Sequence, residues 1–485
     1  MKLKQIIKNI DIIRMNAKPD IEISGICYDS RAAKAGDLFV AVRGFTVDGH
    51  KYIAKAAAAG VAAVLCEEAP EVDIPYILTS DSRKALALAS CEFFGHPASE
   101  MKIIGITGTS GKTTSSYLIK HMLEAKLDAK VGLIGTNGNM IGDEFLHTEH
   151  TTPESYELQK LFRRMAEAGC THVVMEVSSH SLVLDRVAGF DFDVALYTNL
   201  SQDHLDFHNT MEEYAEAKRL MFGRSKIACV NVDDAWAEFM LTGAECEVLG
   251  FTAQGSKARL SASDISYSAS GVSFKANYDS MQADTRLAIP GSFSVYNALG
   301  VMAVGLALGI SLEACADALS GARGVKGRLE LVPTDGDYTV IIDYSHKPDA
   351  LEKVLRSLRS VSRGRLVCLF GCGGDRDRVK RPIMGKIAAD NADFVIVTSD
   401  NPRTEEPQAI IDEIVSGMQD TDTEYAVICD RIEAICWAID NALPGDVILL
   451  AGKGHEDYQV IGHEKHHMDE REIVAEHLVT RRQRS

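Results

Sequence analysis

A glycine-rich turn at residues 107–114 constrains the fold of this chain more than any other feature. The turn has the sequence Thr-Gly-Thr-Ser-Gly-Lys-Thr-Thr, and it follows a short apolar run at 102–106 that is typical of a buried strand. Apolar residues then recur at helical spacing from Leu118 to Leu123. A strand, a glycine turn and a helix in this order form a phosphate cradle, because backbone N–H groups and the positive end of the helix face the anion.

The residues of this turn predict a nucleoside triphosphate site. Lys112 supplies a point charge for the phosphates, and a Thr hydroxyl next to it can reach a magnesium ion. The spacing departs from the G-x-x-x-x-G-K pattern, which requires glycine at 106, where the chain has Ile106. A plain turn is therefore the competing interpretation, and the flanking strand and helix favour the phosphate site.

The length of 485 residues exceeds what one hydrophobic core supports, so we expect two to four domains. A formal net charge of -18 argues against a nucleic-acid partner or a general anionic-membrane surface. The 11 cysteines include no CxxC pair, so neither a zinc site nor a disulfide framework is predicted. No signal-peptide pattern and no long apolar run are present, and we therefore expect a reduced cytoplasmic protein without membrane insertion.

Three blocks of sequence organise the chain, and we assign them to domains at 1–98, 99–326 and 327–485. The first block mixes short strands with an alanine-rich helix at 52–60. The second opens with the phosphate turn and alternates apolar runs with helical sequence, as in a doubly wound sheet. Within it, residues 255–290 predict a small antiparallel insertion. The third block repeats strand and helix, so the chain as a whole predicts an α/β fold.

Polar or glycine-bearing clusters follow four predicted strands of the third block. These clusters are 343–349, 371–377, 399–403 and 452–456. In open α/β sheets the ligand crevice lies beyond the carboxyl ends of the strands, so we predict that the four clusters share one site. A dinucleotide fingerprint would require glycine at 376, where the chain has Arg376, and a nicotinamide enzyme is not expected.

Three side chains of the central block are candidates for chemistry around a magnesium-bound phosphate. Glu176 ends an apolar strand, and carboxylate oxygen is a ligand that magnesium prefers. His204 follows the next strand; either residue alone is unremarkable, but the two lie at successive strand ends. Lys218 by itself is typical of a solvated helix lysine. Burial would lower the pKa of Lys218, and the neutral amine could then react with carbon dioxide to give a metal-binding carbamate.

A series of short segments resembles the motifs of one family, the Mur ligases, and most closely its diaminopimelate-adding members. The segments are TGTSGKTT (107–114), HTTP (150–153), MEVSSH (175–180), TNLSQDHLDFH (198–208), YAEAKRLMF (214–222), GSFSVYNALG (291–300), VKGRLE (325–330), DYSHKPDAL (343–351), GCGGDRD (371–377), SDNPR (399–403) and GKGHE (452–456). The resemblance implies three domains. A small N-terminal α/β domain would bind a UDP-linked substrate, a central P-loop-type doubly wound sheet would bind ATP, and a C-terminal Rossmann-like domain would close over the nucleotide.

The resemblance also implies roles for individual residues. ATP would contact Gly108, Thr109, Ser110, Gly111, Lys112, Thr113 and Thr114, with Asn297, Arg328, Asp343 and His346 toward the adenosine. Magnesium would lie near Thr113, Glu176, His204 and Lys218, with Lys218 modified to N6-carboxylysine. The catalytic set would be Lys112, Glu176, His204 and Lys218. UDP-N-acetylmuramoyl-dipeptide would contact Ser30, Thr151, Thr152, Ser178 and Arg186. The incoming amino acid would contact Arg376, Asp400, Asn401, Pro402, Arg403, Gly452 and Glu456.

Two positions depart from the family pattern. Leu184 stands where members often have a glutamine that touches the nucleotide sugar, and His150 replaces the frequent asparagine before TTP. Both departures concern contacts that the resemblance implies with the UDP-linked substrate.

The activity implied is an ATP-dependent amide-forming ligase of peptidoglycan precursor synthesis, acting as a monomer. The D-glutamate carboxylate of the UDP-linked dipeptide would become an acyl phosphate, which the amine of meso-diaminopimelate attacks. Arg403 explains the choice of amino acid, because a guanidinium pairs bidentately with the distal carboxylate that lysine lacks. Alternatively, Arg403 pairs with Glu405 or Glu406 on a surface loop.

Three other functions remain open at this point. The chain could be a lysine-adding ligase, in which case turnover with lysine would equal or exceed that with diaminopimelate. It could be a P-loop ATPase that works as a switch without ligase activity. It could also be a sensor of UDP-sugars with an inactive ATP site, although Lys112, Glu176 and His204 argue against that.

Overall fold

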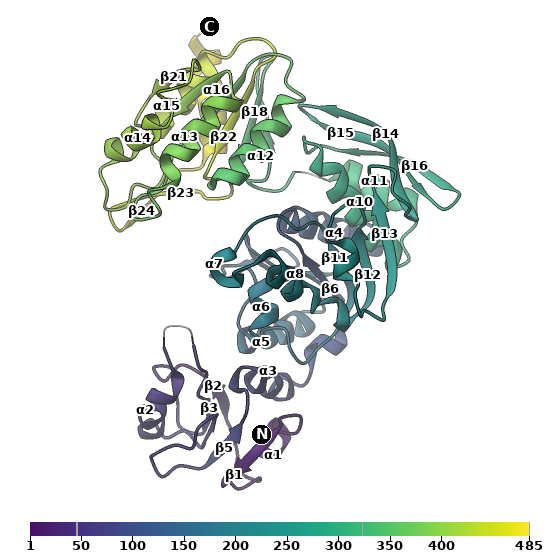
Figure 1. The fold of residues 1–485 in the computed structure, drawn as a ribbon, viewed down its shortest axis with the longest axis vertical. Coiled ribbons are helices and arrows are strands. Elements are labelled where there is room, and N and C mark those ends of the chain that lie inside the picture. Colours follow the sequence, from purple (N-terminus) through teal and green to yellow (C-terminus); the bar gives the residue numbers. More distant parts are fainter. Residues whose placement is uncertain (45–46, 323, 485) are drawn as a thin grey trace. The chain divides into compact units, whose positions relative to one another are not determined.

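The protein was analysed as a computed structural model, which describes residues 1–44, 47–322 and 324–484. The chain divides into two compact units, one formed by 1–260 with 300–310 and the other by 261–299 with 311–485. Each unit is an assembly of helices on β-sheets, so the predicted α/β class is confirmed (Figure 1). In the described part of the chain, no helix is both long and apolar enough to cross a membrane.

The beginning of the first unit is a five-stranded sheet in the order β1-β5-β4-β3-β2. Its strands are β1 (Ile12–Met15), β2 (Gly25–Cys27), β3 (Asp37–Val40), β4 (Ala63–Cys66) and β5 (Tyr76–Thr79). Its helices are α1 (Leu3–Ile6), η1 (Gly49–Tyr52), α2 (Ile53–Ala58), α3 (Ser82–Phe93) and η2 (Pro97–Glu100). Neighbouring strands pair in parallel except β1, which is antiparallel to β5. The predicted alanine-rich helix is present as η1 followed by α2.

The larger sheet of the first unit contains the phosphate turn. Its strands are β6 (Lys102–Thr107), β7 (Val131–Gly135), β8 (Gly138–Ile141), β9 (Glu144–Leu146), β10 (His172–Glu176), β11 (Phe192–Tyr197), β12 (Ser225–Asn231) and β13 (Glu247–Thr252). Its helices are α4 (Lys112–Leu127), α5 (Ser155–Glu167), α6 (Ser179–Val183), α7 (Leu205–His208), α8 (Met211–Arg219), η3 (Phe222–Arg224) and α9 (Ala237–Met240). Strand β6 lies between β10 and β11 and is parallel to both. The chain after β6 continues to β7 and β10 on one side of β6, and the chain after β10 crosses to β11 and β12 on the other side. The phosphate turn therefore lies at a switch point of the sheet, where open α/β sheets bind ligands.

The second unit contains the predicted insertion and the third block. The insertion consists of β14 (Leu260–Ser268), β15 (Gly271–Tyr278) and β16 (Met281–Leu287), and β15 pairs with β16 antiparallel, as predicted. Helix α10 (Phe293–Ala307) crosses from the second unit into the first, and α11 (Leu312–Gly321) packs on β16. The compact units thus do not follow the expected boundary at 326, and the division into three domains stays a prediction.

The third block forms a six-stranded sheet in the order β17-β18-β22-β19-β20-β21. Its strands are β17 (Glu330–Val332), β18 (Thr339–Asp343), β19 (Leu366–Phe370), β20 (Phe394–Val397), β21 (Glu424–Val427) and β22 (Val447–Ala451), followed by the hairpin β23 (Tyr458–Ile461) and β24 (Glu464–His467). Its helices are α12 (Pro348–Arg359), α13 (Lys380–Asn391), α14 (Pro407–Ser416), α15 (Arg431–Asp440) and α16 (Glu470–Arg484). Strands β18, β22, β19 and β20 are parallel neighbours, so their carboxyl ends lie at one edge.

Candidate functional site

The phosphate turn between β6 and α4 depends on two glycines. Gly111 has φ 86° and precedes the first residue of α4, and Gly108 has φ 143°. A Cβ atom at Gly108 would lie 1.9 Å from the Thr198 hydroxyl oxygen, so only glycine fits there. Although the spacing differs from the standard pattern, glycine is present where this backbone needs it.

The turn is fixed by the segment that follows β11. The Thr109 N–H donates to the Asn199 carbonyl at 2.8 Å, and the Ser110 N–H donates to the Asn199 amide oxygen at 3.1 Å. The Lys112 ammonium folds back over the turn and donates to the carbonyls of Gly108 and Thr109 at 2.8 and 2.9 Å. Thr113 and Thr114 follow in the buried first turn of α4. The predicted ATP-contacting residues 108–114 thus form one cradle.

Lys218 lies next to the same turn. Its side chain is 1% exposed, and its ammonium donates at 3.1 Å to the Gly108 carbonyl that Lys112 also contacts. Burial, followed by the charge of Lys112, lowers the pKa of Lys218 well below its ordinary value. The interpretation of Lys218 as a solvated helix lysine was wrong, because the face of α8 that contains Lys218 packs against the phosphate turn.

Glu176 ends β10 and is 1% exposed. Its two carboxylate oxygens accept hydrogen bonds from the Thr136 N–H at 3.0 Å and from the Thr136 hydroxyl at 3.1 Å. Gly135 is required beside it, since a Cβ there would lie 2.4 Å from the Glu176 carboxylate. The Thr136 hydroxyl also lies 3.0 Å from that of Thr151, which connects Glu176 to the predicted substrate-contacting residues.

Two more of those residues, Ser178 and Arg186, contact a third, Thr152. The Thr152 hydroxyl donates to the Glu176 carbonyl at 2.8 Å and accepts from the Ser178 N–H at 3.2 Å. Arg186 donates to the Thr152 carbonyl at 3.0 Å and forms an ion pair with Glu154 at 2.6 Å. The structure therefore brings Thr151, Thr152, Ser178 and Arg186 together with Glu176.

Ser30 lies elsewhere in the first unit, in a cavity of about 460 Å³ that also includes Tyr28, Arg83 and Glu154 in its wall. A second cavity of about 560 Å³ shares Tyr28 and Glu154 with it and includes His150. The two cavities and the Thr152 group thus meet at Glu154, whose carboxylate Arg186 holds. Sequence reasoning missed Tyr28, Arg83 and Glu154, because they belong to no motif.

His204 is in the left-handed region with φ 55° and immediately precedes α7. Its ring lies 5.1 Å from that of His180 and 6.0 Å from that of Tyr214, and the Tyr214 hydroxyl lies 3.2 Å from the Thr109 hydroxyl. His204 is therefore near the phosphate turn, as predicted.

No three His, Cys, Asp or Glu side chains in the described chain form a metal-binding group. The expected set of Thr113, Glu176, His204 and Lys218 offers one carboxylate and one imidazole. Magnesium prefers anionic oxygen ligands, and a carbamate on Lys218 would add one. The set therefore fits magnesium better with the carbamate than without it. Burial lowers the pKa of Lys218, which favours the neutral amine that such a carbamate requires.

A cavity of about 770 Å³ lies at the carboxyl edge of the third-block sheet. Its wall includes Tyr344 and His346 from the first cluster, Gly373 and Arg376 from the second, Asp400, Asn401 and Arg403 from the third, and Gly452 and Glu456 from the fourth. The structure thus brings the four strand-end clusters to one cavity, as predicted. Pro402 does not line the cavity. Its carbonyl oxygen lies close to Gly374, where an added Cβ atom would be only 1.9 Å from that oxygen.

The backbone of Arg403 is held by the hairpin β23–β24. Arg403 has φ 52°, its N–H donates to the Val460 carbonyl at 3.0 Å, and its carbonyl accepts from the Gly462 N–H at 2.8 Å. Its guanidinium donates to the Gly374 carbonyl at 2.8 Å, whereas Glu405 forms its ion pair with Arg381 at 2.8 Å. Within the described residues Arg403 forms no ion pair with Glu405 or Glu406, so the alternative of such a pair on a surface loop is wrong.

The expected adenosine contacts belong to the second unit, and the phosphate turn belongs to the first. Arg328 places its guanidinium 5.1 Å from the ring centre of Tyr344, and His346 lies 2.9 Å from the Tyr344 carbonyl. Asp343 accepts from the Leu329 N–H at 2.8 Å, and burial raises its pKa. Asn297 is buried on a different element, α10.

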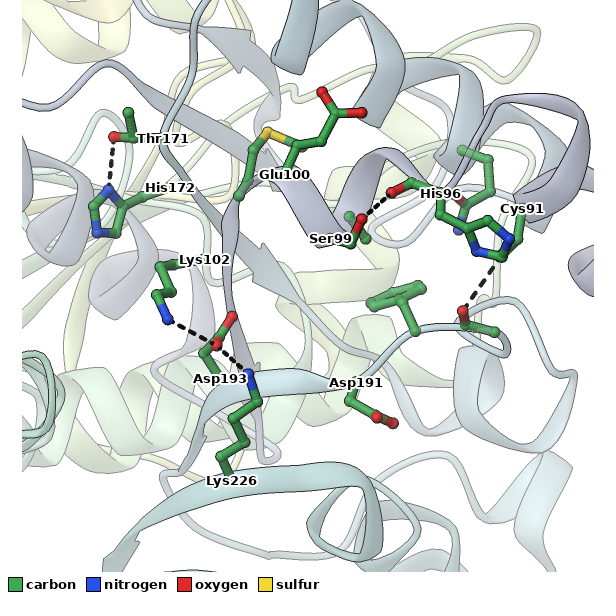
Figure 2. A pocket seen from close by; sticks show the side chains of 15 residues that line it. Cys91, His96, Ser99, Glu100, Lys102, Thr171, His172, Asp191, Asp193 and Lys226 are labelled. Atoms are coloured by element: carbon green, nitrogen blue, oxygen red, sulfur yellow. Dashed lines mark hydrogen bonds and ion pairs between the residues drawn. The ribbon is translucent and has the colours of Figure 1, made fainter.

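One further cavity, of about 670 Å³, lies at the opposite edge of the large sheet of the first unit (Figure 2). Lys102, His172, Asp193 and Lys226, at the amino ends of β6, β10, β11 and β12, lie in its wall. The Asp193 carboxylate is bound by the ammonium groups of Lys102 at 3.4 Å and Lys226 at 2.8 Å. None of the predicted site residues lines this cavity.

Three family models match the chain in the order of its sheets. The Mur ligase family, catalytic domain, matches residues 22–93; the Mur ligase middle domain matches 106–305; and the Mur ligase, glutamate ligase domain, matches 327–454. Together they cover most of the described sequence.

Complete proteins and a solved structure are similar over the same length. A UDP-N-acetylmuramoyl-L-alanyl-D-glutamate–2,6-diaminopimelate ligase from Caldanaerobacter subterraneus subsp. tengcongensis is 47% identical over 99% of both chains. A protein of the same name, numbered 1, from Clostridium acetobutylicum is 45% identical over 99% of both chains. A solved structure with that ligase name has a TM-score of 0.76 at 32% identity and covers 99% of each chain. This chain therefore belongs to the Mur ligase family.

Proposed function

We propose that this chain is an ATP-dependent ligase that joins meso-diaminopimelate to UDP-N-acetylmuramoyl-L-alanyl-D-glutamate. The names of relatives that are 42–47% identical over their full length support this substrate pair. ATP and a UDP-linked sugar are cytoplasmic metabolites, and the reaction is accordingly placed in the cytoplasm.

The observation that supports the amino acid most directly is the cavity in the second unit. Its wall has side chains of both charges: the cations are Lys347, Arg376, Lys380 and Arg403, and the anions are Asp377, Asp400 and Glu456. Diaminopimelate has two carboxylates and two ammonium groups, which complement this set. Lysine has no distal carboxylate and would leave the Arg403 guanidinium facing an ammonium group, which costs binding free energy.

The phosphate turn supports the activation half of the reaction. The terminal D-glutamate carboxylate attacks the γ-phosphorus of ATP, the bond to the β-phosphate oxygen breaks, and an acyl phosphate and ADP form. The amine then attacks the acyl carbon, loses a proton, and expels inorganic phosphate. Lys112 and the N–H groups at the start of α4 stabilise the charge on the transferred phosphoryl group, and magnesium would supply further charge neutralisation when bound.

The environment of Lys218 supports its assignment as a carbamylated lysine. The neutral amine forms a C–N bond with carbon dioxide and releases one proton, and the product is an anionic oxygen donor beside the Gly108 carbonyl. Glu176 and His204 complete the proposed magnesium site, and Ser30, Thr151, Thr152, Ser178 and Arg186 the proposed site for the UDP-linked dipeptide.

The test is the rate of ADP release with UDP-N-acetylmuramoyl-L-alanyl-D-glutamate and either meso-diaminopimelate or lysine. Wild type should turn over diaminopimelate and prefer it strongly. Arg403→Lys removes the bidentate group and should lower kcat/KM for diaminopimelate roughly ten- to a hundredfold, because hydrogen bonds to charged groups contribute about 1.5–3 kcal/mol.

Arg378→Lys is the matched control. Arg378 lies on the neighbouring loop, between β19 and α13; its guanidinium pairs with Glu413, and the residue does not line the cavity. Its kinetics should equal those of wild type. Equal or better turnover of lysine by wild type would contradict the proposal and favour the lysine-adding ligase, and ADP release without any amino acid would favour an ATPase switch.

A further inference from the structure

Lys453, which directly follows Gly452 of the cavity, is fully buried with a relative exposure of 0%. Its ammonium donates to the Asn401 amide oxygen at 2.9 Å, to the Glu456 carboxylate oxygen Oε2 at 2.9 Å, and to the Tyr458 carbonyl. An ammonium group has three N–H donors, so these three acceptors use all of them. Lys453 therefore has no donor left for a ligand, although both of its side-chain partners line the cavity.

Asn401 is committed to the same network. Its amide oxygen accepts from Lys453 and from the Val460 N–H at 2.9 Å, and its amide nitrogen donates to Glu456 Oε2 at 3.0 Å. Both groups that face the amide oxygen are donors, which fixes the orientation of the amide. Asn401 thus links the Lys453 ammonium to the Glu456 carboxylate through hydrogen bonds.

The consequence for Glu456 is that its two oxygens are unequal. Oε2 accepts two hydrogen bonds, from Asn401 and Lys453, whereas Oε1 accepts none within the described chain. The Glu456 side chain is 16% exposed and lines the cavity. Oε2 is therefore held by the protein, and Oε1 is available to a ligand in the cavity.

We propose that Lys453 is a positioning residue for amino-acid recognition, which holds Glu456 so that Oε1 accepts from the distal ammonium of the incoming amino acid. This inference rests on the proposed function. Arg403, on a different loop, then takes the distal carboxylate, so the two polar groups at the far end of diaminopimelate are recognised separately. Because Lys453 is paired and fully hydrogen-bonded, its charge is tolerated inside the protein, and removing it would leave Glu456 partly buried without its counter-charge.

The test compares two substrates in two proteins. 2-Aminopimelate has the same carbon chain and distal carboxylate as diaminopimelate, but hydrogen replaces the distal amine. Lys453→Met, which keeps the side-chain length and loses the charge, should lower kcat/KM for diaminopimelate by roughly tenfold or more, because one partner of a buried ion pair is lost. For 2-aminopimelate, which gives Glu456 no ammonium to bind, the loss should be a few-fold at most.

Lys465→Met is the matched control. Lys465 belongs to the hairpin β23–β24, and its ammonium lies 4.1 Å from the ring centre of Tyr458. The Lys453 ammonium lies 5.3 Å from the same ring centre. Lys465 is exposed, so this variant should leave both substrates unchanged.

If Lys453→Met lowers kcat/KM by the same factor for both amino acids, the ratio between them is unchanged and the inference is overturned. That result would show only that the lysine supports the cavity. If Lys453→Met does not fold, Lys453→Arg is used, because its planar group keeps the charge but cannot direct one donor to each of the three acceptors. Wild type that turns over neither amino acid would overturn the proposed function and this inference together, which distinguishes that failure from the others.

Discussion

At the scale of single residues, the chemistry of the first unit depends on how two amines share one carbonyl. Lys112 and Lys218 both donate to the Gly108 carbonyl, at 2.8 and 3.1 Å. Two ammonium groups this close repel each other, and Lys218 is the one removed from water. Its pKa therefore falls, and the uncharged amine is the form that can react with carbon dioxide.

This state of Lys218 leads to a spectroscopic prediction. In ¹³C-bicarbonate at neutral pH, wild type should show a ¹³C carbamate resonance that Lys218→Arg lacks, because a guanidinium stays protonated. Activity should fall with the loss of that resonance.

Lys120→Arg is the control for burial alone. Lys120 is also buried, with a relative exposure of 6%, but its ammonium forms an ion pair with Glu124 at 2.6 Å. This variant should keep the carbamate signal. A signal that survives in Lys218→Arg would refute the assignment.

At the scale of elements, the hairpin β23–β24 sets the position of the loop that contains Arg403. The backbone of Arg403 is bonded to Val460 and Gly462, and Gln459 donates to the Asp400 carbonyl at 2.7 Å. Arg403 itself has the left-handed backbone that non-glycine residues rarely adopt, with φ 52°. Such a conformation persists when its surroundings fix it, and here the hairpin does so.

Gly462→Ala tests this role of the hairpin. Gly462 has φ 61° and open space around its Cα, so alanine would strain the backbone by about 1–2 kcal/mol without a clash. Relief of that strain should shift the hydrogen bond to the Arg403 carbonyl and raise KM for diaminopimelate several-fold, while KM for ATP is unchanged.

Gly255→Ala imposes the same kind of strain elsewhere. Gly255 has φ 84° and also has nothing near its Cα, but it lies in the first unit. Its steady-state kinetics should match those of wild type. If both variants raise KM for diaminopimelate equally, the hairpin does not control the position of Arg403.

At the scale of the whole molecule, buried histidines make stability depend on pH. His455 lies against Tyr344, with ring centres 4.8 Å apart, and its Nδ1 is buried without a hydrogen-bond partner in the described chain. Burial, then the nearby charges of Arg328, Lys326 and Arg471, lower the pKa of His455 to about 4. The folded protein therefore holds this ring neutral.

The lowered pKa predicts the sign of the pH dependence. Between pH 4 and the ordinary value of 6.5, unfolded His455 binds a proton that the folded form does not, so stability rises with pH across this window. The slope from one such group is at most about 1.4 kcal/mol per pH unit. In His455→Gln, the thermal midpoint should rise less between pH 4 and 6.5 than in wild type, and the two proteins should run parallel above pH 7. An identical slope in both would show that His455 titrates normally.

Local patterns predicted much of the architecture. The apolar runs of the third block predict four strands, at 339–343, 365–370, 394–398 and 447–450, and each is present within one residue of these ends. The antiparallel insertion is present at β14–β16. Apolar runs and glycine turns encode such elements directly, because hydrophobic periodicity and backbone freedom are properties of neighbouring residues. The rule that ligands bind at the carboxyl ends of parallel strands then predicted the cavity of the second unit from sequence order alone.

Burial and long-range hydrogen bonds are what only the tertiary structure decided. Lys218 and Lys453 have the sequence surroundings of solvated lysines, yet both are enclosed by segments far away in the chain, around Gly108 and Asn401. Tyr28, Arg83 and Glu154 lie together in a cavity wall although no motif contains them. The sequence by itself determined the elements and the edge at which their polar ends meet. Which amine loses its water, and which carboxylate oxygen stays unbonded, depends on distances between segments remote in sequence, and those distances exist only in the folded chain.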